Sequence, residues 1–417
     1  MRVKINANTL LSCMLVAFWC KTPIVSALSS LIGRTAANDL LNAALLVMFV
    51  TYAVCFRVQD SIKVFLVYVF IALLILITLY VHPDYLDWYK HSQYGIDKQF
   101  LDLGGAIWAF LLISLYRDDE RLLRDLKILT AIVFAAYFFK YLGAAFRGYW
   151  IVGMSGKHRS YDLEFGFRIQ FATAFWGAYG LLKNKRYLYL YALGLIVILL
   201  GGSRAAFIWA LAVLAAVIPF RYGGMSPRKK KITIVTCVLM IPVTILVITN
   251  LELILAFGAV ALKKIGITSR TLTSMAKGTL SDDHARDVIY KMARNRIHSG
   301  GLFGWGFYGD RVYIGKRFYW GYSHNVFLEL LVTLGYLGGS IAIFLLVRGI
   351  FRLFKKAKDS TRQVILLTFF CASLRLILSS SFWYEPSFWA MLALMLTWGK
   401  KAVRAEKEPV QLEWRTA

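Results

Sequence analysis

Acidic side chains are scarce in this 417-residue sequence, which holds 23 Asp and Glu against 49 Lys and Arg and has a formal net charge of +26. Charged residues of both signs make up only 17% of the chain. Hard metal ions need several oxygen ligands held close together. We find no cluster of carboxylates that meets this need, and we therefore predict no metal site.

Cysteines are also few, and all five fall inside predicted apolar spans. They read as small core residues and offer neither a disulfide framework nor a metal site. A cleavable signal peptide is not evident either. The first apolar run carries Lys21 in its middle and lacks a small-residue cleavage site, so we expect it to be a span.

Hydrophobic residues, in contrast, make up 59% of the chain, and its mean hydropathy is +0.58. A soluble core cannot hide that much apolar surface, so the composition predicts an all-α polytopic membrane protein. The apolar runs predict about twelve transmembrane helices: 9–31, 39–57, 62–82, 101–116, 126–146, 167–183, 187–202, 205–220, 232–250, 326–350, 363–380 and 386–399.

The basic residues predict the orientation of these spans. With the N-terminus in the cytoplasm, 27 of the 49 cations fall on the cytoplasmic side, nearly all of them in short loops. Most of the net charge therefore fixes topology, and nucleic-acid binding is not favoured. The predicted organisation is a membrane region at 1–250, a large outer loop at 251–323, a second membrane region at 324–399 and a cytoplasmic tail at 400–417.

The outer loop is unusually basic, with eleven cations against five carboxylates between Leu251 and Ser323. Outer loops normally lack such an excess, which indicates an anionic ligand at the outer membrane surface. Within the loop, apolar spacing predicts an amphipathic helix over 281–298. Arg294 and Arg296 near its end suit the helix dipole, whereas Arg286 near its start does not, which favours a ligand role for Arg286.

A glycine-aromatic segment follows at 301–311. Glycine permits tight turns, and aromatic faces stack on sugars as readily as on core neighbours. The segment is not a nucleotide-binding loop, because no strand precedes it. Near its end lie Asp310 and Arg311, and a basic-aromatic run then leads to His324.

Three further arginines stand near the ends of predicted spans or inside them. Arg168 either pairs with Glu164, four residues before it, or binds substrate. Arg204 follows two glycines in a tight outer hairpin, where it either snorkels or meets an anion. Arg375 lies mid-membrane in an apolar run and is either a functional residue or a partner of Glu385.

His324 stands at the start of an apolar helix, directly after the cationic loop. A lone histidine in such a place is more often structural than catalytic. Histidine can, however, accept a hydroxyl proton near neutral pH, and arginines can hold a diphosphate through paired hydrogen bonds. Together these residues suit attack by a sugar hydroxyl on a carbon that carries a lipid diphosphate.

His324 and Asn325, followed by nine residues, Gly335, two residues and Gly338, fit the motif of the O-antigen ligase family. The chain resembles the larger superfamily of ligases and oligosaccharide-repeat polymerases of the lipid-linked (Wzy-type) pathway along nearly its whole length. The resemblance implies that His324 activates the acceptor hydroxyl while Arg204 and Arg286 hold the donor diphosphate, and that no cofactor is needed. We group Arg168, Arg311 and Arg375 with these two, and Asn325, Gly335, Gly338 and Asp310 as supporting residues.

The resemblance further implies a bacterial inner-membrane protein with its active site on the periplasmic side. Its partners would be an oligosaccharide on undecaprenyl diphosphate, a glycan or lipid A-core acceptor, membrane lipids and a possible chain-length regulator. The segments around Glu164, Gly201, Gly304 and Ser323 look more like polymerases than ligases, whereas the histidine motif fits both. A transporter of lipid-linked sugars would share the cationic cavity, although we find no internal repeat typical of transporters.

Overall fold

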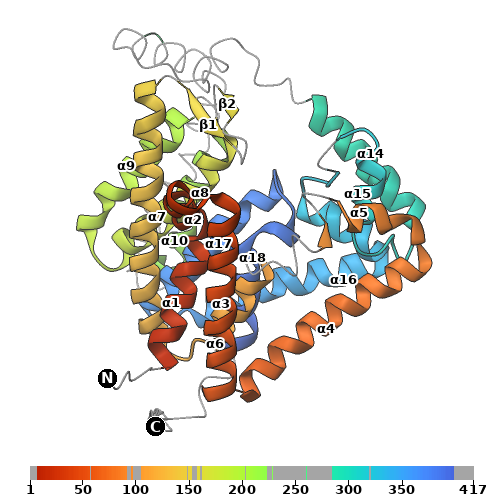
Figure 1. Ribbon diagram of the computed structural model, residues 1–417, viewed down its shortest axis with the longest axis horizontal. Coiled ribbons are helices and arrows are strands. Elements are labelled where there is room, and N and C mark those ends of the chain that lie inside the picture. The colour runs from red at the N-terminus through yellow and green to blue at the C-terminus, as the bar shows by residue number, and fades with distance from the viewer. Residues whose placement is uncertain are drawn as a thin grey trace. The chain divides into compact units, whose positions relative to one another are not determined.

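The computed structural model describes residues 7–56, 58–91, 95–96, 105–147, 149–152, 157–159, 162–201, 203–222, 228, 260, 284–318 and 321–398. These residues fold as two compact units (Figure 1). Unit 1 combines the chain up to Leu129 with Arg286–Ala357 and the chain from Leu376. Unit 2 combines Thr130–Ala285 with Lys358–Arg375.

Unit 1 gathers helices from both ends of the chain. At its centre α6 (Ile107–Leu115) packs against α18 (Pro386–Thr397), and both are apolar on all sides and largely buried, as such helices should be. The other members are α1 (Ala7–Trp19), α2 (Lys21–Ile32), α3 (Arg34–Phe56), α4 (Val58–Val81), α5 (Leu86–Tyr89), the start of α7 (Asp119–Arg147), α14 (His284–Gly300), α15 (Gly309–Ile314) and α16 (Val326–Lys356).

Unit 2 is built around α8 (Leu163–Leu182), which packs against α9 (Leu188–Gly201), α10 (Arg204–Tyr222) and α17 (Ser360–Ser373). The unit also holds the rest of α7 and a short antiparallel hairpin. In that hairpin β1 (Trp150–Val152) pairs with β2 (Lys157–Arg159), with Trp150 opposite Arg159. The predicted all-α class is therefore correct apart from this one hairpin among the described residues.

Four helical segments are long and apolar enough to cross a membrane: Arg34–Val54, Asp119–Arg147, Val326–Lys356 and Ser360–Ile377. The number becomes six if two sharply bent pairs each count as one span, within the part of the chain that the structure describes. Eleven of the twelve predicted spans coincide with helices, while 232–250 lies outside the described residues. Several of these helices are short, so twelve spans stay a prediction.

One of the two bends interrupts a span that the sequence predicts as continuous, and the other falls at the end of the predicted span 62–82. The predicted span 9–31 is α1 followed by α2 at an angle of 77°. Pro23, in the first turn of α2, cannot donate the hydrogen bond that a continuous helix would need. At the end of α4, the chain turns by 116° at His82, directly before Pro83.

Candidate functional site

His324 lies in a tight turn directly before α16. Its φ of 53° places it in the left-handed region, which few residues other than glycine adopt. Asn325 caps α16 by accepting hydrogen bonds from the backbone N–H groups of Phe327 and Leu328, and its own amide donates to the Ile377 carbonyl at 2.9 Å. These hydrogen bonds hold Asn325 in place, and Asn325 in turn holds the backbone directly after the histidine.

Asp310 fixes the residue that precedes the histidine. Its carboxylate accepts hydrogen bonds from the backbone N–H and the hydroxyl of Ser323, at 3.0 and 2.9 Å. Both residues are fully buried. His324 is therefore held from both sides, by Asp310 through Ser323 and by the cap at Asn325.

Behind this turn lies a buried ionic cluster centred on Arg311, whose side chain has 0% exposure. Its guanidinium pairs with Asp310 and, at 2.6 Å, with Glu329 of α16. It also donates to the Ser381 hydroxyl at 2.7 Å, and that hydroxyl donates to Glu329 at 2.6 Å. Two carboxylates therefore surround one guanidinium, away from solvent.

Aromatic rings enclose the same guanidinium. It lies 4.6 Å from the ring centre of Tyr308, 5.5 Å from that of Tyr384 and 5.7 Å from that of Tyr322. An arginine in this environment has no surface to offer a diphosphate. The predicted role of Arg311 in donor binding does not fit, and we assign Arg311 to holding the histidine turn instead.

Backbone strain gathers around this cluster. Tyr308, His324 and Ser380 are the three non-glycine residues with positive φ among those the structure describes. Tyr308 lies against Arg311, His324 follows Ser323, and Ser380 precedes Ser381. Each of these three backbone conformations costs of order 1–3 kcal/mol. Strain of this kind persists only where the surrounding contacts impose it, and it is found most often at functional sites.

The histidine ring itself is mostly shielded. Its centre lies 4.2 Å from that of the Tyr322 ring, and its Nδ1 atom is buried without a hydrogen-bond partner among the described residues. Burial, together with the positive charges of Arg286 and Arg311, lowers the pKa of His324 to about 4. The imidazole is therefore neutral at pH 7 and able to accept a proton.

Arg286 reaches this region from α14, the amphipathic helix that the sequence predicts. The helix is confirmed from His284 onward, while residues 281–283 of the predicted range lie outside the described residues. Its apolar face, formed by Ile289, Ala293 and Ile297, packs against Val332 of α16. This packing sets Arg286, a half-buried residue, on the same unit as His324 and close enough to lower its pKa.

Gly335 supplies a break inside α16, with a φ of 72° and a ψ of −174°. The glycine-aromatic segment enters this break. Trp305 and Gly306 donate backbone hydrogen bonds to the carbonyls of Val332 and Thr333, at 2.8 and 2.9 Å. In return the Gly301 and Leu302 carbonyls accept from the backbone N–H groups of Tyr336 and Leu337 at 3.0 and 3.1 Å. The segment thus pairs with the backbone N–H and C=O groups of α16 that the break leaves without partners in the helix.

The glycine-aromatic segment is therefore structural along much of its length. Arg296 of α14 stacks on Trp305 at 3.4 Å and donates to the Tyr85 hydroxyl at 2.8 Å. Trp88 packs against Gly315 and Gly321. These rings join the segment to the chain around α5 and do not stand free for a sugar.

Unit 2 brings together the other predicted arginines around the start of α8. Gly166 lies directly against Ser203, and a Cβ at Gly201 would approach Phe165 to 2.7 Å, so the hairpin that carries Arg204 rests on α8. The side chain of Arg204 itself lies outside the described residues. Arg375 stacks over Phe167 at 4.2 Å.

One of these arginines follows a sequence prediction and one differs from it. Arg168 is paired with Glu164 at 2.8 Å on the exposed face of α8, which is the simpler of the two predicted alternatives. Arg375 lies in a 3₁₀ helix, Leu374–Ile377, at the end of a candidate span and not in its middle. Stacking over Phe167 stabilises the Arg375 guanidinium, so this position is less costly than the sequence indicates.

The sequence reading missed Glu329, Ser381, Tyr308 and Tyr384. A carboxylate four residues after a helix cap, inside an apolar helix, was the one available signal for Glu329. Among the residues that the structure describes, no group of three or more His, Cys, Asp or Glu side chains could hold a metal ion.

Comparison with known protein families and with curated proteins finds no match to this chain. The geometry of the chain therefore carries the functional argument.

Proposed function

We propose that this chain is a membrane glycosyltransferase that moves an oligosaccharide from undecaprenyl diphosphate to a sugar hydroxyl, and that it polymerises O-antigen, capsule or exopolysaccharide repeat units. The observation that carries the proposal is the state of His324. This histidine is held in a strained turn by contacts on both sides, is neutral at pH 7 and keeps a buried Nδ1 without a partner among the described residues. A general base must be unprotonated and have a lone pair that can take the hydroxyl proton, and a neutral imidazole meets both needs.

In the proposed reaction the acceptor hydroxyl attacks the anomeric carbon of the donor sugar, from the face opposite the diphosphate. A new C–O bond forms as the bond to the diphosphate breaks, so the configuration is inverted. His324 takes the hydroxyl proton, and undecaprenyl diphosphate leaves with the electron pair of the broken bond. The reaction is balanced without a cofactor or a metal ion.

Arg286 is the donor-binding residue best supported on the unit of His324. An anion held by Arg286 would offset the charge that lowers the pKa of His324, and the base would become stronger once the donor is bound. Arg204, Arg168 and Arg375 remain proposed donor-binding residues of unit 2. Of these, Arg204 rests on its place in the hairpin after two glycines and on the resemblance.

The proposed setting is the inner membrane of a bacterium, with twelve spans and the active site on the periplasmic side. The candidate spanning helices support a membrane protein. The basic short loops support the orientation. The preference for a polymerase over a ligase rests on the resemblance of the four segments around Glu164, Gly201, Gly304 and Ser323.

The test is to reconstitute the purified chain with its lipid-diphosphate repeat unit, with and without lipid A-core, and to size the glycans formed. A ladder from the repeat unit alone is the expected result. Transfer only in the presence of lipid A-core would make the chain a ligase. A lack of transfer under both conditions would favour a transporter of lipid-linked sugars.

The His324→Ala variant tests the base directly. Removing a general base should lower the transfer rate by about 10²–10⁴-fold, with donor binding retained. His298→Ala is the matched control, because His298 lies at the end of α14 with its Nδ1 paired to the Tyr336 hydroxyl at 2.6 Å. Normal glycan assembly by His324→Ala would contradict the catalytic assignment.

A further inference from the structure

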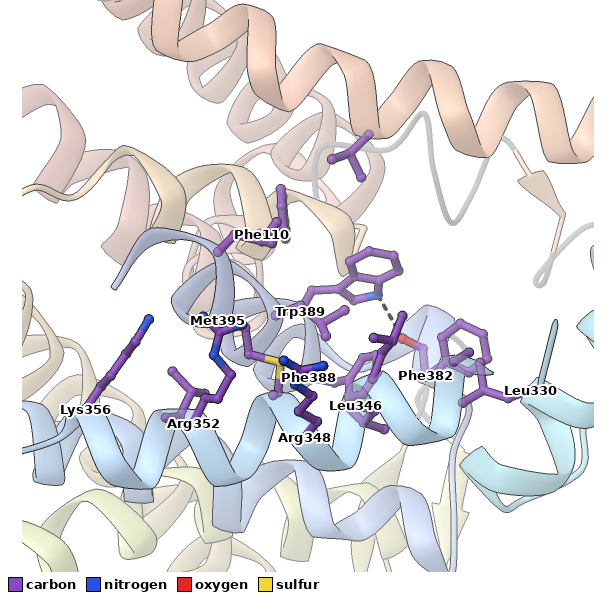
Figure 2. A pocket seen from close by; sticks show the side chains of 17 residues that line it. Phe110, Leu330, Leu346, Arg348, Arg352, Lys356, Phe382, Phe388, Trp389 and Met395 are labelled. Carbon is purple, nitrogen blue, oxygen red and sulfur yellow. Dashed lines mark hydrogen bonds between the residues drawn. The ribbon is translucent and has the colours of Figure 1, made fainter. Parts of the chain in front are cut away.

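Unit 1 contains a cavity of about 640 Å³ beside α16, and no residue of the His324 turn lines it. Its walls come from α16 and α18, with Val67 of α4, Phe110 of α6 and Phe382 of the turn before α18 (Figure 2). The volume lies within the range of about 300–1,000 Å³ that is common for ligand sites. Apart from three cations, every lining residue is apolar.

The three cations are Arg348, Arg352 and Lys356, which recur at every fourth residue of α16. This spacing places them on one face of the helix, and Figure 2 shows them following one another along it, with Leu330 and Phe382 toward the other end. Like charges at this spacing repel one another. The helix dipole favours Lys356 in the last turn, but Arg348 lies two turns earlier and gains little from it.

The length of α16 places these cations at the level of lipid headgroups. A hydrocarbon core of about 30 Å is crossed by about twenty helical residues at 1.5 Å each. The predicted span 326–350 ends between Arg348 and Arg352, so the three cations lie where that span meets the headgroups. The apolar part of the cavity then lies in the hydrocarbon core, and the cationic part lies at its boundary.

The apolar part is shaped for a flexible chain. Phe382, Phe388, Trp389 and Met395 line it, and the Trp389 indole is already satisfied by the Phe382 carbonyl at 2.8 Å. These four side chains therefore present only apolar surface to the cavity, which suits an acyl chain. The cationic end, in contrast, suits a phosphate.

We propose that this cavity is a binding site for an anionic phospholipid, whose acyl chain occupies the groove between α16 and α18 while its headgroup phosphate meets Arg348, Arg352 and Lys356. Charge complementarity selects the occupant: a zwitterionic lipid would fill the groove equally well but would be held less strongly by three cations. By the predicted topology this site lies in the cytoplasmic leaflet, where anionic lipids attract basic segments. It is separate from the donor site and independent of the proposed reaction.

The test uses the full chain in nanodiscs that contain a phosphatidylglycerol or a phosphatidylcholine probe, each with a photoreactive group on its acyl chain. The crosslinked peptides are identified by mass spectrometry. We expect preferential labelling of α16 and α18 by the phosphatidylglycerol probe. Each cation near the surface contributes about fivefold in affinity, so the double variant R348Q/R352Q should weaken labelling by about 25-fold.

Lys355→Gln is the matched control, because it removes a charge from the same end of α16 at a residue that does not line the cavity. Ala342→Phe should abolish labelling while all three cations remain, since it fills the groove. Equal labelling by the two probes, or an equal loss in Lys355→Gln, would overturn the proposal.

Competition separates the other occupants. Inorganic phosphate at the concentration of the lipid should not displace the probe. Displacement by a polyprenyl phosphate but not by phosphatidylglycerol would overturn the proposal in favour of an isoprenoid site. Labelling that appears only after removal of residues 400–417, or only in the monomer, would overturn it in favour of the tail or a second copy.

Discussion

At the scale of single residues, the molecule separates two kinds of arginine that the sequence groups together. Arg311 is surrounded by Asp310 and Glu329 and has no exposed surface, so its charge is used inside the protein. Arg286 is half-buried and lies near His324, where its charge acts on the histidine. Position, and not residue type, decides whether an arginine is enclosed by carboxylates or acts on the histidine.

The Arg286→Gln variant should shift the pH dependence of the reaction. His324 must be neutral to act as a base, so with a pKa of about 4 the rate should fall only in strong acid. Removing the nearby positive charge raises the pKa of His324 toward its ordinary value, and the acid limb of kcat/KM should move to higher pH. The measurement is a pH–rate profile of the wild type and the variant.

Lys291→Gln, on an exposed position of α14, is the control for Arg286→Gln. Its acid limb should coincide with that of the wild type. An unchanged acid limb in Arg286→Gln would show that this arginine does not act on the histidine.

The Glu329→Leu variant should be strongly destabilised. It leaves Arg311 buried with one carboxylate in place of two, and breaking a buried ion pair costs about 3–5 kcal/mol. Thermal unfolding of the purified protein in detergent measures the loss. Glu164→Leu is the comparison, because Glu164 forms an exposed pair with Arg168, and such pairs contribute about 0–1 kcal/mol. Similar melting temperatures for the two variants would contradict the buried cluster.

At the scale of elements, α16 and the glycine-aromatic segment act as one structure. The break at Gly335 opens the helix, and the segment around Trp305 closes it with backbone hydrogen bonds. The two glycines of the predicted motif therefore have different roles. Gly335 forms the break, while Gly338 continues the helix beyond it.

Gly335→Ala should displace the glycine-aromatic segment from α16. A Cβ at this position would meet the Leu302 carbonyl, and the left-handed backbone alone costs about 1–3 kcal/mol for a residue other than glycine. We expect lower thermal stability, faster proteolysis between residues 301 and 311, and loss of transfer. Gly338→Ala, whose Cβ would come no closer than 3.0 Å to Leu334, should be far milder. Equal protease resistance of the two variants would refute this role of Gly335.

At the scale of the whole molecule, the basic short loops predict which segments face the cytoplasm. In a cysteine-free background, a cysteine at Asn184, in the loop between α8 and α9, should react with an impermeant maleimide only after the membrane is permeabilised. A cysteine at Ser299, an exposed residue at the end of α14, should react in intact cells. The reverse pattern would invert the predicted topology and place His324 in the cytoplasm.

The sequence alone determined the features that depend on local composition and spacing. Long apolar runs predicted the helices, since burial of apolar surface needs little knowledge of the partner. Spacing predicted α14, and the histidine at the start of α16 was identified as the candidate base. These features follow from interactions between residues close together in the chain.

Only the tertiary structure decided how the charges are used. Asp310, Arg311 and Ser323 meet Glu329 and Ser381 from segments up to about seventy residues apart, and no periodic pattern records that meeting. The same holds for the loop that fills the break at Gly335, because its hydrogen bonds join backbone groups that carry no sequence signal. An arginine buried between two carboxylates and an arginine that faces a ligand cannot be told apart in a sequence. Their roles differ because their partners and the surrounding dielectric differ.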